Sequence, residues 1–298
     1  MRDLPPIDFA LTTAADAEGV SFADLGLGGN IVRTLGDLGA VRPFPIQVAT
    51  IPDAVAGRDV LGRARTGSGK TIAFGAALVE RLLKLKREDP EAFAGAAAPQ
   101  RRRGEPERRG SRSARNPRAL ILAPTRELAL QIDRTVHPIA RSVGFYTGQF
   151  VGGVPLEPQL HALERGVDIV IGTPGRVRDL VNRRRLDLRQ VRVSVIDEAD
   201  HMCDLGFLEA TQWVLRQTAR RGQRLLFSAT LDGEVSDLVA EFLTGPAAHE
   251  AEEASAAAVR HDVLIVLREH KNDVLVELAS GGERTLVFCR TRAAAERV

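Results

Sequence analysis

Short apolar runs that alternate with longer helix-like stretches are the feature of this sequence that most constrains its fold. Each run is followed by a polar or glycine-bearing cluster, as expected for strands buried on both faces of a parallel sheet. We therefore predict a set of parallel strands. They lie at Asp59 to Leu61, Ala119 to Leu122, Asp168 to Ile171, Val191 to Ile196 and Leu225 to Phe227.

The stretches between these runs have the apolar period of helices, as at Thr71 to Leu85 and Leu128 to Ala140. This alternation predicts an α/β fold with a doubly wound, mostly parallel sheet and helices on both faces. Two helices precede the first strand: one after Asn30 as N-cap, ending at Gly39, and one within Pro45 to Gly57. Because ligands of such sheets bind at the carboxyl ends of the strands, the polar clusters mark the candidate site.

Composition sets limits on the kind of protein. At 298 residues and 44% hydrophobic content, the chain can bury one sizeable core and part of another, and its formal charge of +2 does not by itself indicate a nucleic-acid partner. No apolar run approaches the roughly 20 residues that span a bilayer, and residues 1–13 lack the layout of a signal peptide. Cys203 and Cys289 are too few for a disulfide framework or a zinc site. We expect ordinary thiols, no membrane association and a cytoplasmic protein.

Changes in composition divide the chain into parts. We predict an N-terminal extension at 1–20, a main domain at 21–250, a linker at 251–258 and the start of a second α/β unit at 259–298. The second unit is expected to contain strands at Val263 to Leu267 and Thr285 to Phe288. Its 40 residues are fewer than a stable domain usually needs, so we expect it to be incomplete.

One segment of the main domain, Gly95 to Pro117, is rich in Arg, Gly, Pro and Ala and has no apolar period. We predict a disordered surface insertion there. It is either a solvated loop without a dedicated role or an electrostatic tether for phosphate backbones.

A glycine-rich loop, ARTGSGKT from Ala64 to Thr71, follows the first predicted strand and leads into a helix. Backbone N–H groups in such a loop, with a helix N-terminus behind them, cradle phosphates. Lys70 is suited to neutralise β- and γ-phosphate oxygens and Thr71 to hold Mg²⁺. A chance glycine-rich turn is the alternative.

Two acids, Asp197 and Glu198, end the strand in VRVSVIDEAD. Asp197 is placed to hold Mg²⁺ through water, and Glu198 to orient and activate the attacking water in phosphoryl transfer. Adjacent acids alone also fit an acidic helix N-terminus. The phosphate-binding loop upstream favours the catalytic interpretation.

Four further segments occur in a fixed order: PTRELALQ from Pro124, TPGR from Thr173, DEAD from Asp197 and SAT from Ser228. With them, the chain from about Phe22 to its C-terminus, without the arginine-rich insertion, resembles the DEAD-box ATP-dependent RNA helicases. The resemblance implies that the main domain is a RecA-like lobe using ATP and Mg²⁺ and that a second RecA-like lobe begins after the linker.

The resemblance also implies roles for individual residues. Catalysis is expected at Lys70, Asp197, Glu198, Ser228 and Thr230, and the metal at Thr71 and Asp197, partly through water. ATP contacts are expected at Phe22, Arg42, Gln47, Ala64, Arg65, Thr66, Gly67, Ser68, Gly69, Lys70, Thr71, Asp197 and Glu198. RNA-backbone contacts are expected at Pro124, Thr125, Arg126, Gly152, Gly153, Thr173, Pro174, Gly175 and Arg176.

Some of these positions have a more specific implied function. Gln47 matches the family glutamine that reads the adenine edge, and Ser228 and Thr230 match an element that couples ATP state to RNA engagement through Asp200. Ala64 stands where the general phosphate-binding-loop pattern has glycine. The chain departs from the family pattern at Ala40, normally aromatic or large, and at Phe44, normally Thr or Ser.

The second lobe is represented by one motif, LVFCRTR from Leu286 to Arg292. In this family the second lobe supplies arginines that reach the γ-phosphate, and loss of such an arginine costs about 10³ to 10⁵ in turnover in related enzymes. We therefore expect weak ATP binding and little or no unwinding from this chain alone.

The sequence as a whole predicts an RNA-dependent ATPase that remodels RNA duplexes or RNA–protein complexes. We expect a monomer that works with proteins of ribosome assembly or of RNA decay. The alternatives are a DNA-directed P-loop motor, which Gln47 and Asp200 disfavour, and a non-catalytic ATP-gated RNA-binding scaffold, which the pair Asp197 and Glu198 disfavours.

Overall fold

The computed structural model of the chain describes residues 7–93, 116–251, 262–281 and 284–297. The chain forms two compact units, Met1–Ala254 and Ser255–Val298. All strands of the β-sheet belong to the first unit. Among the described residues, no helix is both long and apolar enough to cross a membrane.

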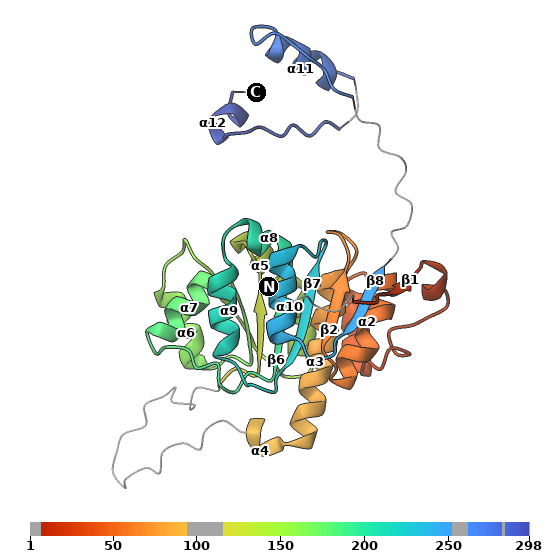
Figure 1. Cartoon of the computed structure of the whole chain (residues 1–298), viewed down its shortest axis with the longest axis vertical. Coiled ribbons are helices and arrows are strands. Elements are labelled where there is room, and N and C mark those ends of the chain that lie inside the picture. Colours follow the sequence, from red (N-terminus) through yellow and green to blue (C-terminus); the bar gives the residue numbers. More distant parts are fainter. Residues whose placement is uncertain (1–6, 94–115, 252–261, 282–283, 298) are drawn as a thin grey trace. The chain divides into compact units, whose positions relative to one another are not determined.

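The first unit is built on an eight-stranded sheet in which every neighbouring pair of strands is parallel (Figure 1). The strand order is β1-β8-β2-β7-β6-β3-β5-β4. This confirms the predicted α/β class. The strands are β1 (Ala10–Thr12), β2 (Val60–Arg63), β3 (Ala119–Leu122), β4 (Thr147–Phe150), β5 (Ile169–Gly172), β6 (Val193–Ile196), β7 (Gln223–Ser228) and β8 (Ala247–Ala251).

Helices cover both faces of the sheet (Figure 1). One hydrophobic core lies under α1 (Gly29–Asp37), α2 (Pro45–Ala56), α3 (Lys70–Glu88) and α5 (Arg126–Ser142). The other lies under α7 (Pro174–Asn182), α8 (Ala199–Asp204), α9 (Leu208–Arg216) and α10 (Gly233–Phe242). The remaining described helices of this unit are α4 (Pro90–Phe93), α6 (Glu157–Arg165) and the 3-10 turn η1 (Ala15–Ala17).

Successive residues of each central strand face the two cores in turn. Ile121 of β3 and Val195 of β6 face the first core, while Leu122 and Ile196 face the second. Successive residues of a strand point to opposite faces, so a strand covered on both sides must be apolar throughout. This requirement is why the five predicted strands could be read from the sequence.

Three strands, β1, β4 and β8, were not predicted. Two of them, β4 (TGQF) and β8 (AAHEA), contain polar and small residues in place of a continuous apolar run. β1 and β4 form the two edges of the sheet, and β8 lies next to β1. Edge positions are buried less completely, so their sequences carry a weaker apolar signal.

The boundaries of the main domain differ from the predicted ones. β1 lies within the predicted 1–20 extension and is paired with β8, so this part of the extension belongs to the sheet. β8 continues to Ala251, the first residue of the predicted linker, because Ala251 pairs with Thr12. The rest of that linker, 252–258, and most of the arginine-rich insertion, 94–115, lie outside the described residues.

The first helix begins earlier than predicted. Its N-cap is Gly28, and Asn30 lies inside the first turn. The Gly28 N–H donates to a carboxylate oxygen of Glu80 in α3 at 2.8 Å, so a tertiary contact satisfies a donor that a side-chain cap would otherwise take. The predicted ends are confirmed, since Gly39 and Gly57 have φ of +84° and +92°, where glycine is favoured.

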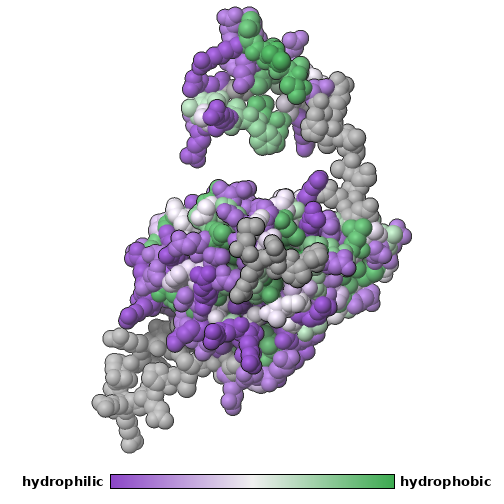
Figure 2. Space-filling view, in the orientation of Figure 1, coloured by the Kyte–Doolittle hydropathy of each residue, from purple (hydrophilic) through white to green (hydrophobic). Residues whose placement is uncertain are grey.

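The second unit contains two helices among its described residues, α11 (Lys271–Ala279) and α12 (Arg292–Ala295). The strands expected at 263–267 and 285–288 are not observed: neither segment has a ladder partner among the residues that the structure describes, and Ile265 and Phe288 are 99% and 88% exposed. A strand needs a neighbour for its backbone groups. Figure 2 accordingly shows hydrophobic residues on the visible surface of this unit.

Candidate functional site

The carboxyl ends of β2, β7 and β6 bring three of the predicted motifs together. We call the side of the sheet at which the strands end the carboxyl edge, and the side at which they begin the amino edge. β7 lies between the other two, with Arg63 of β2 in register with Ser228 and Ile196 of β6 in register with Leu226. Because the strands are parallel, the loop after β2, the SAT segment and Asp197 all leave the sheet on the same side. The structure therefore brings together the lysine of the loop and the acids that follow β6.

The loop after β2 is held in shape by its own backbone. The Lys70 Nζ donates to the Ala64 carbonyl oxygen at 2.9 Å, which curls the lysine back over the loop, and Lys70 is also the first residue of α3. Gly67 and Gly69 both have φ of +89°, a conformation that other residues rarely adopt. The glycines at these two positions are thus required by the backbone.

Gln47 of α2 supports this loop from the side. Its Nε2 donates to the Gly69 carbonyl oxygen at 3.0 Å, and its Oε1 accepts from the Phe44 N–H at 2.8 Å, so it also caps α2. A Cβ added at Gly69 would lie 2.5 Å from the Gln47 Nε2. The predicted adenine contact of Gln47 stays a prediction, and its observed role is to tie α2 to the phosphate-binding loop.

The acids after β6 lie in contrasting surroundings. Asp197 is buried, and burial raises its pKa to about 7, an effect that the nearby positive charge of Lys70 opposes and that Glu198 reinforces. Glu198 is partly exposed and has φ of +51°, an uncommon conformation for a non-glycine residue. Unusual backbone conformations of this kind cluster at functional sites.

Glu198 connects the acids to the loop. Its Oε1 accepts from the Thr66 hydroxyl at 3.2 Å, and its Oε2 lies 3.3 Å from the His201 Nδ1. The contact with His201 was not predicted, although its position three residues after Glu198 is helical spacing. Thr66 and His201 thus orient the carboxylate from two sides.

Asp200 is the acceptor that joins the DEAD and SAT segments. Its Oδ2 accepts from the backbone N–H groups of Ala229 and Thr230 at 3.0 and 2.9 Å and from the Thr230 hydroxyl at 3.2 Å. The Ser228 hydroxyl accepts from the Asp200 N–H at 3.2 Å. Burial alone would raise the pKa of Asp200, but these hydrogen bonds outweigh burial and lower it.

The residues predicted to hold Mg²⁺ fit that ion. Asp197 offers a carboxylate at the strand end, and Thr71 follows Lys70 at the start of α3. Magnesium is usually held by one or two carboxylates together with waters and phosphate oxygens. The described residues contain no group of three or more His, Cys, Asp or Glu suited to a metal ion.

The predicted RNA-contact residues follow β3, β4 and β5, which are neighbours in the sheet. Thr125 caps α5 by accepting from the Leu128 N–H at 3.2 Å, and Arg126 is exposed. Arg176 donates through Nη2 to the Val154 carbonyl oxygen at 3.3 Å, while its buried Nη1 has no hydrogen-bond partner among the described residues. Pro124 and Pro174 are buried and help to shape the turns.

The other members of this group follow the same pattern. Gly152 and Gly153 come directly after β4, and Gly153 has φ of +71°. Thr173 and Gly175 lie at the start of α7, where Gly175 is exposed. The predicted RNA contacts therefore share one edge with the phosphate-binding loop.

Two predicted ATP contacts lie upstream. Phe22 is 3% exposed and packs in the first hydrophobic core, and Arg42 is exposed just before α2. In the loop, Arg65 and Thr66 are exposed, and the buried Ser68 hydroxyl has no hydrogen-bond partner among the described residues. A buried hydroxyl without a partner is suited to receive one from a bound group.

Comparison with known proteins gives consistent matches. Residues 44–238 match the family described as DEAD/DEAH box helicase. The chain is 36% identical over 291 residues to the chloroplastic DEAD-box ATP-dependent RNA helicase 3A of Zea mays, covering 95% of this chain and 36% of that protein. It is 38% identical over 289 residues to the ATP-dependent RNA helicase RhlB of Xanthomonas axonopodis pv. citri, covering 94% of this chain and 46% of that protein.

Solved structures agree. A DEAD box protein from the hyperthermophile Methanococcus jannaschii superposes with a TM-score of 0.64 at 28% identity, covering 93% of this chain and 68% of the other. A hypothetical ATP-dependent RNA helicase from Sulfolobus tokodaii gives a TM-score of 0.60 at 29% identity, covering 76% and 57%. The chain spans less than half the length of the curated relatives above.

Proposed function

Because the chain belongs to the DEAD/DEAH box helicase family, we propose that its first unit binds and hydrolyses ATP to remodel RNA duplexes or RNA–protein complexes. The observation that carries the proposal is the meeting of Lys70, Asp197 and Glu198 on one edge of the sheet. A lysine at a helix N-terminus beside a buried acid and a partly exposed acid is the arrangement that phosphoryl transfer requires.

The roles follow from the surroundings of each group. Lys70 binds the β- and γ-phosphate oxygens once its hydrogen bond to Ala64 is exchanged for them. Glu198, oriented by Thr66 and His201, positions the attacking water and accepts its proton. Thr71 and Asp197 would hold Mg²⁺, which neutralises charge that develops on the phosphates.

Asp200 couples the ATP site to the SAT segment. Its hydrogen bonds fix the SAT segment relative to the acids, so a shift of Asp197 or Glu198 on ATP binding must move Ser228 and Thr230 or strain those bonds. The hydroxyls, arginines and exposed amides after β3, β4 and β5 bind RNA phosphates without reading bases. The proposed RNA selection therefore depends on shape and 2′-hydroxyls.

The proposal extends to the setting of the protein. It acts in the cytoplasm as a monomer, with proteins of ribosome assembly or RNA decay as candidate partners. The family relationship supports this proposal. Contacts with the RNA backbone carry no sequence information, so they do not select one particular RNA.

The test is a titration of the chain with ATP and Mg²⁺. Lys70→Ala is expected to weaken binding about 30- to 100-fold, since hydrogen bonds to charged groups contribute about 1.5–3 kcal/mol each. Lys271→Ala removes the same kind of side chain from α11 and is expected to change nothing. Equal ATP affinity in the two variants would refute the proposed site.

A second measurement addresses the nucleic acid. In the presence of ATP and Mg²⁺, the chain is expected to bind single-stranded RNA more tightly than DNA of matched sequence, because the 2′-hydroxyl distinguishes the two. Equal binding would favour the DNA-directed motor.

A further inference from the structure

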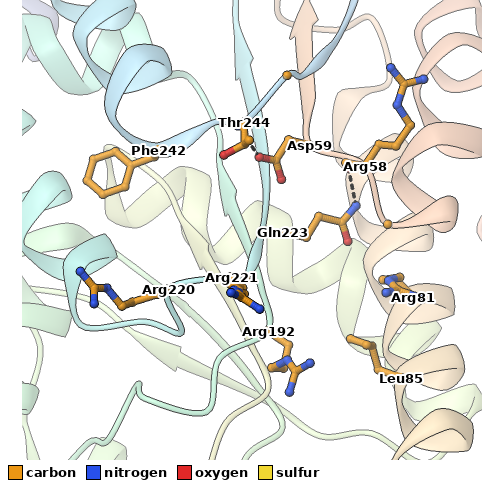
Figure 3. A pocket seen from close by; sticks show the side chains of 13 residues that line it. Arg58, Asp59, Arg81, Leu85, Arg192, Arg220, Arg221, Gln223, Phe242 and Thr244 are labelled. Carbon is orange, nitrogen blue, oxygen red and sulfur yellow. Dashed lines mark hydrogen bonds between the residues drawn. The ribbon is translucent and has the colours of Figure 1, made fainter.

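A pocket (Figure 3) lies at the amino ends of β2, β6 and β7. The candidate ATP site lies at the other end of these strands. We call this pocket the amino-edge pocket and define it by its lining residues Asp59, Arg81, Arg192, Arg220, Arg221 and Gln223. All but Arg81 directly precede or begin β2, β6 or β7. The cavity measures about 410 Å³, within the range of small-molecule sites.

Positive charge dominates this pocket. Among the described residues, Arg192, Arg220 and Arg221 have no carboxylate within ion-pair distance. Burial lowers the pKa of the neighbouring Arg118; the charge of Asp168 opposes this shift, and the positive charge of Arg192 adds to it. In Figure 3 the guanidinium groups of Arg192 and Arg221 lie between Arg81 and Arg220. Unpaired like charges in one cavity favour an anionic ligand.

The acid in the pocket does not neutralise these arginines. The two carboxylate oxygens of Asp59 accept hydrogen bonds from the backbone N–H groups of Arg224 and Thr244 at 2.8 and 2.7 Å. Arg58, which also lines the cavity, is paired with Asp53 at 2.9 Å and points away from the other guanidinium groups in Figure 3.

Gln223 provides an independent observation. It is 8% exposed, and its Nε2 donates to the carbonyl oxygens of Ala54 and Arg58 at 2.8 and 2.6 Å. These two bonds fix the amide orientation, and its Oε1 is buried without a hydrogen-bond partner in the described part of the chain, as is the Nε of Arg81. A buried acceptor beside a row of cations requires a ligand that carries a donor as well as negative charge.

A ribonucleotide has the matching groups. Its phosphate suits arginine forks, its ribose hydroxyls can donate to the Gln223 Oε1, and its base can lie against either Leu85 or Phe242, which line the cavity from opposite faces of the sheet. We propose that the amino-edge pocket binds a ribonucleotide, either free or as part of an RNA strand. A bare phosphate or sulfate would leave the Gln223 oxygen unpaired.

This site is separate from the ATP site. Arg81 lies eleven residues after Lys70 on α3, which at 1.5 Å per residue places it about 16 Å along the helix. The proposal therefore does not depend on the function of the carboxyl edge.

The experiment is a calorimetric titration of the whole chain with uridine 5′-monophosphate, inorganic phosphate and a 5′-phosphorylated hexauridylate. The double variant Arg192→Gln/Arg221→Gln is expected to bind the uridine ligands at least tenfold more weakly than wild type. The matched control Arg33→Gln/Arg165→Gln removes two exposed arginines elsewhere and is expected to stay within twofold. Equal unfolding midpoints show that both variants fold.

The outcomes separate the possibilities. Phosphate is expected to bind at least tenfold more weakly than the monophosphate, and Lys70→Ala to leave that binding unchanged. Hexauridylate binding that is tighter than that of the monophosphate and that the double variant weakens at least tenfold identifies an RNA strand as the ligand of this pocket. Equal or weaker hexauridylate binding identifies a free nucleotide. The proposal is overturned if wild type binds neither uridine ligand, if the control loses as much affinity, if phosphate binds equally well, or if Lys70→Ala abolishes binding.

Discussion

At the carboxyl edge of the sheet, charged side chains are matched by groups from neighbouring strands, whereas at the amino edge several arginines face one cavity without carboxylate partners. The Oδ2 of Asp200 accepts three hydrogen bonds, and Asp197 lies beside Lys70. Arg192 and Arg221 have no such match among the described residues. The charged groups of the carboxyl edge are therefore paired within the protein. The positive charges of the amino edge are left for an anionic ligand to neutralise.

The largest expected effect tests whether the carboxyl edge is catalytic. Glu198→Gln keeps an oxygen that can accept from Thr66 but removes the base, so ATP turnover is expected to fall about 10²- to 10⁴-fold while ATP binding is retained. The measurement is steady-state ATPase activity with RNA in a form that carries a full second lobe. Unchanged turnover would favour an ATP-gated scaffold.

The next effect tests how much the burial of Asp197 at the carboxyl edge destabilises the folded protein. Burial raises the pKa of Asp197 to about 7, so the folded protein retains a proton that the unfolded chain has already lost. The stability that this proton provides is complete below pH 4 and is lost as pH rises toward 7. Without metal, the free energy of unfolding of Asp197→Asn is expected to exceed that of wild type by roughly 2–4 kcal/mol at pH 8 and to equal it at pH 4.

Urea unfolding in a chelating buffer at the two pH values measures this difference. A gap between the proteins that does not change with pH would show that Asp197 is ionised in the folded protein.

A smaller effect concerns the loop that the carboxyl edge surrounds. Gly67 and Gly69 share a φ of +89°, but a Cβ would meet no atom within 4 Å at Gly67 and would press on Gln47 at Gly69. We expect Gly67→Ala to cost about 1 kcal/mol from backbone conformation alone and Gly69→Ala about 2–3 kcal/mol. Thermal unfolding of the two variants measures the added cost of contact with Gln47 and Phe44, and equal losses would mean that both side chains can move aside.

The smallest effect is expected at the amino edge and has the opposite sign. Arg192→Gln/Arg221→Gln removes like charges that repel one another, so stability at low salt is expected to rise by up to about 0.5 kcal/mol. The gain is expected to disappear at high salt because the charges are exposed. A destabilisation above 1 kcal/mol would show that these arginines have structural partners, and the contrast between the edges would fail.

Much of the fold was predictable because the central strands are covered on both faces. β3 (Ala119–Leu122) was predicted with its observed bounds, and α2 was predicted with Pro45 near its start and Gly57 after its end, since continuous apolar runs and Pro and Gly boundaries are local signals. β1, β4 and β8 were not, because strands at or near an edge are buried through partners that are distant in sequence. Asn30 was a plausible cap, but the carboxylate of Glu80 placed the helix start at Gly29.

The candidate site was predictable for a related reason. The loop from Ala64 to Thr71 and the acids after β6 are contiguous motifs whose chemistry is recognisable before folding. The links of Glu198 with Thr66 and of Gln47 with Gly69 were not, because each joins residues on different elements.

By itself, the sequence determined that this protein has a parallel α/β sheet with a phosphate-binding loop and a pair of acids at strand ends. Only the tertiary structure decided that Lys70 and Asp197 meet across β7 and that arginines from α3 and from the loops before β6 and β7 line one cavity. The physical reason is that periodicity and motifs reflect interactions between residues close in sequence. A pocket between elements depends on the order of the strands in the sheet, which no single segment determines.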